Sequence, residues 1–419
     1  MKELVSSSEE RPNLMISIYI YILAMLFPQI SGFKFLQSNA MLFNIVVLAL
    51  FLFYSLYYFT HVKTINMGGL ILFLLFASCQ LATLHISRQL NQFYPFDKLD
   101  VNYVISPVYI LLFYGVFNKY KLTGTYLDKF MQMYIYLMLY ASLYNFIVNY
   151  GDIRNLLRLA GADQVSFSSF FEDRNTYGKF LHYGCISAIC SYDRTSRKAY
   201  LYVIVFLIMN LVLTLSRTSV LSLLIFILIY ALASSKSVWR DFFLMVLIAG
   251  AIVGFLASDN LISDFVISFL VRPERGLTHR DFIWAEGWKI FVENDVFFGS
   301  GYSAAKSMIE NYSGYGFHSG YLMALTSIGL CGFLFMAFFI CRSFRNVYFI
   351  IRLDRKTGAA FLGVLLSFLA MAVTESVMIF QSSTISFVST VMIVMLPQCY
   401  LNGLRGETAD SPHPNCAPS

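Results

Sequence analysis

Charged residues are scarce in this 419-residue sequence: Asp, Glu, Lys and Arg together make up 13% of it, against 58% hydrophobic residues. Soluble globular proteins carry roughly 25% charged residues, so a water-soluble fold of this length is excluded. The apolar runs are uninterrupted and reach the 20 or so residues that a helix needs to cross a bilayer, whereas a β-barrel shows alternating segments of about 10 residues. The sequence therefore predicts an all-α, polytopic integral membrane protein.

Cysteine and histidine are also few, and their spacing indicates no cofactor. None of the seven cysteines forms a CxxC pair, and no set of cysteines and histidines has the spacing of metal ligands. Most of the cysteines lie in apolar runs, where a free thiol packs as a small hydrophobic group. We therefore expect neither a disulfide framework nor a bound metal, and nothing in the composition indicates a nucleic-acid partner.

The long apolar runs predict about twelve membrane-spanning helices in a single transmembrane domain of residues 1–405, followed by a disordered cytoplasmic tail, 406–419. Two connecting loops are long, 150–175 and 259–316, and the second precedes helix ten. The predicted spans lie near residues 14–31, 41–60, 67–84, 101–118, 130–149, 176–192, 199–215, 218–234, 241–258, 317–341, 358–375 and 383–403.

One arginine determines how the apolar stretch 199–233 is divided. As a single helix this stretch would be about 52 Å long at 1.5 Å per residue, much longer than a hydrocarbon core of about 30 Å. It must therefore form two helices that fold back on each other. The only polar place for the turn is Ser216 to Ser219, which contains Arg217. Arg217 is thus expected at a membrane surface, or just below it in a protein-lined cavity.

The distribution of basic residues predicts which surface this is. With the N-terminus in the cytoplasm, most lysines and arginines of the short loops fall inside, including the run from Arg342 to Lys356. This agrees with the positive-inside rule, and the reverse orientation does not. Both termini are therefore expected in the cytoplasm, and both long loops and Arg217 on the outer face.

The second long loop contains a predicted interfacial helix. In "THRDFIWAEGWKIFVEN" the residues Trp284, Trp288 and Phe291 recur at helical spacing, as in a helix lying on a membrane surface with its tryptophans at headgroup depth. Arg280 lies four residues before Trp284 and is expected to share that face and to point toward the headgroups. It either binds lipid phosphates at the interface or binds an anionic substrate.

His318 follows this loop, where the chain re-enters the membrane. The positive end of a helix disfavours an imidazolium ion, so His318 is expected to be neutral and able to act as a general base. The alternative is a histidine that caps the helix at the interface.

Further ionisable residues are expected on the same face. Arg154 and Arg158 form a basic ridge that contacts solvent, lipid phosphates or substrate. Arg174 and Asn175 open the sixth span. Glu375, near the outer end of span eleven, is either functional or a partner of Arg217. Arginines that converge on one surface favour a phosphate or diphosphate on a lipid as the ligand.

These residues resemble the O-antigen ligase and O-antigen polymerase (Wzy-type) superfamily of bacterial membrane glycosyltransferases. The resemblance covers the topology and three segments: "LSRTSVLSLL" with its Ser-Arg pair, "HRDFIWAEGWKIFVENDVFFGSGY" with Arg-x3-Trp and a Gly-rich turn, and "HSGYLMALTSIGLCG". The family usually has Pro-Asn before span six, where this chain has Arg174 and Asn175.

The resemblance implies transfer of a glycan from undecaprenyl diphosphate at the periplasmic face of the inner membrane, with inversion and without a metal. Arg217 and Arg280 would bind the diphosphate, and His318 would orient or deprotonate the acceptor hydroxyl. Arg174, Asn175, Arg154, Arg158, Trp284 and Glu375 are the expected substrate-binding residues. Membrane lipids and the chain-length regulator and flippase of the same pathway are the expected partners.

Three functions remain open on the sequence. A polymerase would transfer the glycan to another lipid-linked repeat unit, and we favour it because the outer loop is of modest size. A ligase would transfer the glycan to the lipid A core, which the pattern at His318 favours. A transporter of lipid-linked oligosaccharides would need polar residues lining the middle of several spans, whereas here they gather at the outer surface. A non-catalytic envelope scaffold is a further alternative.

Overall fold

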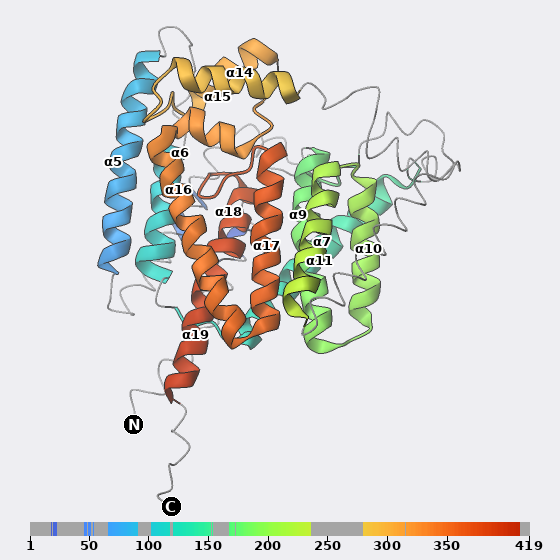
Figure 1. Cartoon of the computed structure of the whole chain (residues 1–419). Helices are drawn as coiled ribbons and strands as arrows, with labels where there is room; N and C mark the ends of the chain where they lie inside the picture. The colour runs from blue at the N-terminus through green and yellow to red at the C-terminus, as the bar shows by residue number, and fades with distance from the viewer. Residues whose placement is uncertain are drawn as a thin grey trace, which may run out of the picture.

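The structure is a computed structural model that describes residues 66–90, 102–117, 120–151, 153, 167–171, 173–235, 280–314 and 316–410, with single positions between residues 18 and 53. Within these residues all regular secondary structure is helical, which confirms the predicted all-α class. Most helices run side by side in a bundle, and α14 and α15 lie across one end of it (Figure 1).

The helices follow one another along the chain with short connections in most places. Their bounds are α5 Met67–Leu90, α6 Asn102–Ile110, the π-helical segment η2 Leu111–Val116, α7 Gly124–Val148, α9 Arg174–Thr195, α10 Ala199–Leu213, α11 Arg217–Ser234, α14 Arg280–Glu293, α15 Tyr302–Ser313, α16 Gly320–Leu353, α17 Arg355–Thr374, α18 Thr384–Thr390, the π-helical segment η4 Val391–Met395 and α19 Leu396–Asp410. Within the described residues, six continuous helical stretches are long and apolar enough to cross a membrane.

Every predicted span inside the described residues coincides with a helix, whereas 14–31, 41–60 and 241–258 lie largely or wholly outside them. Several helices are longer than the predicted spans; α5 continues to Leu90 and α7 begins at Gly124. Helix α16 continues to Leu353 instead of stopping at 341, because Val347 and Ile350 still bury apolar side chains. Helix α19 is described to Asp410, inside the predicted tail.

The predicted hairpin around Arg217 is confirmed. Helix α10 ends at Leu213 and α11 begins at Arg217, so the long apolar stretch is two helices. The hydroxyls of Ser216 and Ser219 lie 3.0 Å apart at the start of α11. Helix α11 then packs along α17, with Gly363 against the ring of Phe226.

Helix α16 is broken at Gly329, where φ is 63° and ψ is −171°. The loop between α14 and α15 lies against the break. Leu330 donates its backbone N–H to the carbonyl of Val296 at 2.8 Å, and Cys331 donates to that of Phe297 at 3.0 Å. An unpaired backbone group in hydrocarbon costs several kcal/mol, so the loop supplies what the broken helix lacks. Gly329 allows the break because glycine adopts a positive φ without the strain that a side chain would add.

Candidate active site

Four helix ends meet at one end of the bundle, below α14. Helices α9, α11 and α16 begin there and α17 ends there (Figure 1). Side-chain contacts join these ends: Lys179 to Glu375, and Thr218 to Thr374 at 3.1 Å between their hydroxyl oxygens. Segments far apart in the sequence therefore place their ionisable residues in one region.

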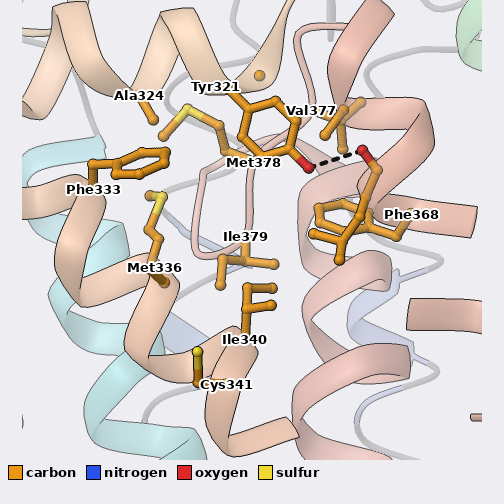
Figure 2. Close-up of a pocket in the computed structure, with 14 residues that line it drawn as sticks. Tyr321, Ala324, Phe333, Met336, Ile340, Cys341, Phe368, Val377, Met378 and Ile379 are labelled. Carbon is orange, nitrogen blue, oxygen red and sulfur yellow. Dashed lines mark hydrogen bonds between the residues drawn. The ribbon is translucent and has the colours of Figure 1, made fainter. Parts of the chain in front are cut away.

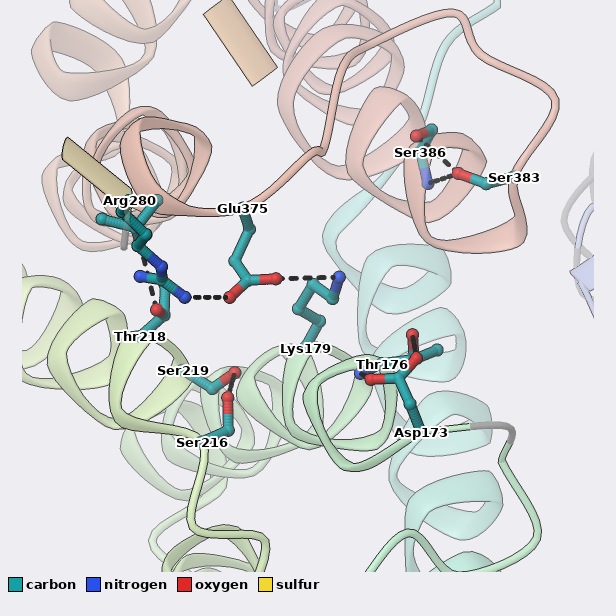
Figure 3. Close-up of polar contacts among 11 residues, drawn as sticks. Asp173, Thr176, Lys179, Ser216, Thr218, Ser219, Arg280, Glu375, Ser383 and Ser386 are labelled. Atoms are coloured by element: carbon teal, nitrogen blue, oxygen red, sulfur yellow. Dashed lines mark hydrogen bonds and ion pairs between the residues drawn. The ribbon is translucent and has the colours of Figure 1, made fainter. Parts of the chain in front are cut away.

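Glu375, the residue that ends α17, lies between two cations (Figure 3). Its Oε1 is 3.4 Å from a guanidinium nitrogen of Arg280, and its Oε2 is 3.4 Å from Nζ of Lys179. The Glu375 side chain is only 6% exposed, and those of Lys179 and Arg280 are 11% and 20% exposed. A buried carboxylate is costly unless it is paired, so each cation stabilises it. The cluster of these three residues keeps one net positive charge.

Local sequence at the start of α9 positions Lys179. Asp173 caps the helix, accepting the backbone N–H of Thr176 at 2.9 Å and its hydroxyl at 2.6 Å. Gly178 then lets α9 approach the start of α11, because a Cβ there would come within 2.9 Å of both Ser219 Oγ and Ser216 Cβ. This close approach brings Lys179 beside the turn that carries Arg217.

Arg217 is the first residue of α11 and is partly buried. Its neighbour Thr218 contacts Thr374, which directly precedes Glu375. Figure 3 shows Thr218 beside Arg280 and Glu375. The structure thus places Arg217 at the same end of the bundle as Arg280 and His318, as predicted.

His318 is held in an unusual backbone conformation just before α16. Its φ is +46°, a value that costs a non-glycine residue about 1–3 kcal/mol and persists only where neighbours impose it. Trp284 donates its indole N–H to the His318 carbonyl at 3.2 Å. On the other side Ser319 caps α16 by accepting the N–H of Leu322 at 3.4 Å. These two contacts fix the backbone on both sides of the His318 side chain and so determine where its imidazole lies.

The surroundings of His318 favour the neutral imidazole. Burial lowers the pKa of His318 below its ordinary value, and the charge of Arg280 lowers it further. Glu375 raises the pKa, and Lys179 lowers it. The predicted direction is therefore confirmed, with burial as the largest cause. A neutral imidazole accepts a proton, whereas an imidazolium cannot.

One predicted orientation on α14 was wrong. Arg280 was expected to point toward lipid headgroups, but it points to Glu375, because a buried carboxylate attracts the nearest cation. The indole N–H of Trp284 donates to the His318 backbone, and Trp288 is 54% exposed. The headgroup depth expected for both tryptophans stays a prediction.

The remaining predicted residues lie at the margin of the site or beyond the described part of the chain. Arg174 and Asn175 are the first two residues of α9 and are partly buried. Arg154 and Arg158 fall outside the described residues.

Sequence reasoning missed Lys179 and α15. The signal for Lys179 was a lysine inside a predicted membrane span, which is a functional candidate by default. The signal for α15 was the pair Ala304 and Ala305 followed four residues later by Met308 and Ile309, all of which are buried. The missed lysine adds a third cation to the predicted pair of arginines.

The arrangement suits an anionic ligand and a proton acceptor side by side. A guanidinium has five N–H donors, and the bond to Glu375 uses one of those of Arg280. The others have the geometry to bind phosphate oxygens in pairs. His318 is close enough to this cluster for Arg280 and Lys179 to influence its pKa. The site can therefore hold a phosphate or diphosphate group next to a general base.

Residues 202–337 match the family model described as O-antigen ligase (Wzy_C). The matched stretch runs from α10 into α16 and contains Arg217, Arg280, Trp284 and His318. The match confirms the resemblance to the O-antigen ligase and polymerase superfamily, and it supports a multi-pass membrane enzyme of O-antigen or lipopolysaccharide assembly. No curated protein matches the sequence.

Proposed function

We propose that this chain is a glycosyltransferase of the bacterial inner membrane that polymerises glycan repeat units carried on undecaprenyl diphosphate. The observation that carries the proposal is the convergence of Arg280, Lys179 and His318 around the buried Glu375, at the end of the bundle where Arg217 also lies. A phosphate-binding cation cluster beside a neutral imidazole is what this transfer requires.

In the proposed reaction, Arg217 and Arg280 bind the diphosphate of the donor. The acceptor oxygen attacks the anomeric carbon from the face opposite the diphosphate, which inverts the configuration. As the new C–O bond forms, the C–O bond to the diphosphate breaks and its electron pair passes to the diphosphate oxygen. The cations stabilise that growing charge, and His318 takes the proton of the acceptor hydroxyl. Because diphosphate is a good leaving group, the reaction needs no metal.

Basic residues support a periplasmic location for the site. The turns at the opposite end of the bundle carry Arg197 and Lys198 between α9 and α10, and Arg355 and Lys356 after α16. Cytoplasmic loops are enriched in lysine and arginine. The proposal therefore places the cation cluster on the outer side, where flipped lipid-linked glycans are available.

A ligase is the second candidate, because the family model that matches residues 202–337 is described as O-antigen ligase. The two functions share the donor and the chemistry and differ in the acceptor, which is another repeat unit or the lipid A core. A deletion strain separates them. Single repeats on the lipid core indicate a polymerase, whereas an undecorated core with accumulating lipid-linked polymer indicates a ligase.

Transfer by the purified protein from a defined undecaprenyl-diphosphate glycan, with and without a chelator, tests the proposal. Release of undecaprenyl diphosphate should be equal in both conditions. Arg217→Ala should lower transfer by roughly 10²–10³-fold while the protein stays abundant, the usual effect of removing one transition-state donor. Arg197→Ala, an exposed arginine at the other end of the bundle, is the control and should transfer normally. Unchanged transfer by Arg217→Ala would refute the proposal.

A further inference from the structure

An apolar pocket lies between α16 and α17, next to the candidate active site (Figure 2). Its volume is about 180 Å³. Its walls come from one face of α16, from the end of α17 and from the three residues Val377 to Ile379. We call it the α16–α17 pocket.

The α16–α17 pocket offers almost nothing to a polar ligand. Its lining includes Phe333, Met336, Ile340 and Phe368, and the phenol of Tyr321 already donates to the carbonyl of Leu369 at 2.9 Å. An apolar cavity of about 150 Å³ stays dry and binds small hydrocarbons. The pocket is therefore suited to a segment of hydrocarbon chain.

One end of the pocket is formed by the segments that carry the site. Gly320 lies two residues after His318, and Val377 lies two residues after Glu375. A Cβ on Gly320 would approach the carbonyl oxygen of Val377 to 2.2 Å, so these two segments are in direct contact. A ligand whose anionic head lay at Arg280 would thus have its chain at the mouth of the pocket.

The pocket extends along α16 on both sides of Gly329. Beyond the break in α16, its lining residues Phe333, Met336, Ala337, Ile340 and Cys341 recur at the spacing of one helix face.

We infer that the α16–α17 pocket binds the isoprenoid chain of the lipid donor whose diphosphate lies at the cation cluster. This inference rests on the proposed function for the identity of the head group. A single-chain lipid fits better than a phospholipid, because a phospholipid brings ester groups that need polar partners and a second chain that needs its own space. The pocket would then make the enzyme favour donors whose diphosphate carries an isoprenoid chain.

The test compares a donor that carries an undecaprenyl chain with a short-chain donor whose diphosphate carries only a methyl group, which cannot reach into the pocket. Wild-type protein should have the lower KM for the long chain. Ala337→Trp fills the pocket and should raise the KM for the long-chain donor roughly tenfold, with little effect on the short-chain donor. Leu334→Trp is the control, because Leu334 is on the same helix but 57% exposed and outside the pocket. Equal effects of Ala337→Trp on both donors, or none, would overturn the inference.

A binding measurement separates this inference from the proposed function. A photoreactive prenyl diphosphate without sugar should label peptides that contain Met336 or Met378, and undecaprenyl phosphate should compete with it. Labelling in the pocket without any glycan transfer by the wild type would refute the proposed function alone. Transfer with labelling elsewhere, or labelling that phosphatidylethanolamine vesicles displace equally well, would refute the pocket assignment alone.

Discussion

His318 is the residue whose role depends most on its neighbours. Its backbone is held at positive φ between the Trp284 indole and the Ser319 cap, and its imidazole is kept neutral by burial and by Arg280. Two separate sets of neighbours thus determine its position and favour its neutral form. Two predictions at the residue scale follow from these two properties.

Replacing Trp284 by Phe should lower kcat about fivefold and leave KM nearly unchanged. The substitution keeps the aromatic body but removes the N–H that binds the His318 carbonyl, a loss of about 1 kcal/mol in positioning. Steady-state kinetics with the purified protein would measure it. Trp288→Phe, one turn further along α14 and exposed, should behave as wild type. Equal kinetics of the two variants would contradict the positioning role.

The acidic limb of the pH profile of kcat/KM should have its midpoint below pH 6.5. The pKa of His318 is lowered from 6.5, so the imidazole stays neutral, and active as a base, at pH values where an ordinary histidine is protonated. Activity should therefore be retained to lower pH and fall as pH drops through the lowered pKa. His318→Asn should abolish this limb together with most of the activity. A midpoint above 6.5 would show that another group acts as the base.

At the scale of elements, the break in α16 helps to hold α14 in place over the candidate site. The chain between α14 and α15 pairs with the backbone groups that Gly329 frees, and so ties α14, which carries Arg280 and Trp284, to α16, which His318 precedes. Irregular backbone at membrane depth is tolerated only where protein or water pairs with it. The geometry of the candidate site therefore depends on Gly329, a residue outside the cation cluster.

Gly329→Ala should destabilise the protein far more than Gly314→Ala. Both glycines have positive φ, 63° and 69°, so both variants bear the strain of a left-handed conformation, about 1–2 kcal/mol. A Cβ on Gly329 would in addition lie 2.4 Å from the backbone of Phe297, whereas one on Gly314 meets nothing within 4 Å. The total for Gly329→Ala should be roughly 3 kcal/mol or more. Thermal unfolding in detergent measures both, and similar melting temperatures would contradict the packing argument.

At the scale of the whole molecule, basic residues gather at two opposite ends of the helix bundle. The cation cluster is buried at one end around Glu375, while exposed lysines and arginines lie at the turns of the other end. Figure 1 shows these ends separated by the length of α16 and α17. The positive-inside rule predicts that the far end faces the cytoplasm, and the cation cluster, with one net positive charge, is suited to an anion.

This distribution predicts the sidedness of the protein. In a variant without the exposed native Cys341, Gly314→Cys should react with a membrane-impermeant thiol reagent from the periplasmic side of intact cells. Lys198→Cys should react only after the inner membrane is opened, because its turn follows the positive-inside rule. Both native residues are exposed, so access to the reagent depends on the side of the membrane. The reverse labelling pattern would place the site in the cytoplasm.

The sequence alone was enough for the properties that depend on periodicity and composition. Low charge and long apolar runs predicted the all-α membrane class, and the length of a bilayer span required the turn at Arg217. The direction of the shift in the pKa of His318 was predicted from the positive end of α16, but its largest cause, burial, came only from the structure.

Only the tertiary structure decided which ionisable groups meet. Arg280 turns away from the lipid toward Glu375, and Lys179 joins them from α9, because a buried carboxylate selects its partners by distance in space. Sequence spacing describes one helix at a time, so it could neither bring together residues nearly 200 positions apart nor show that Gly329 breaks α16 to receive a loop. The lengths of the membrane spans and the all-α class follow from the local sequence, whereas the arrangement of the candidate site follows from how the helices pack.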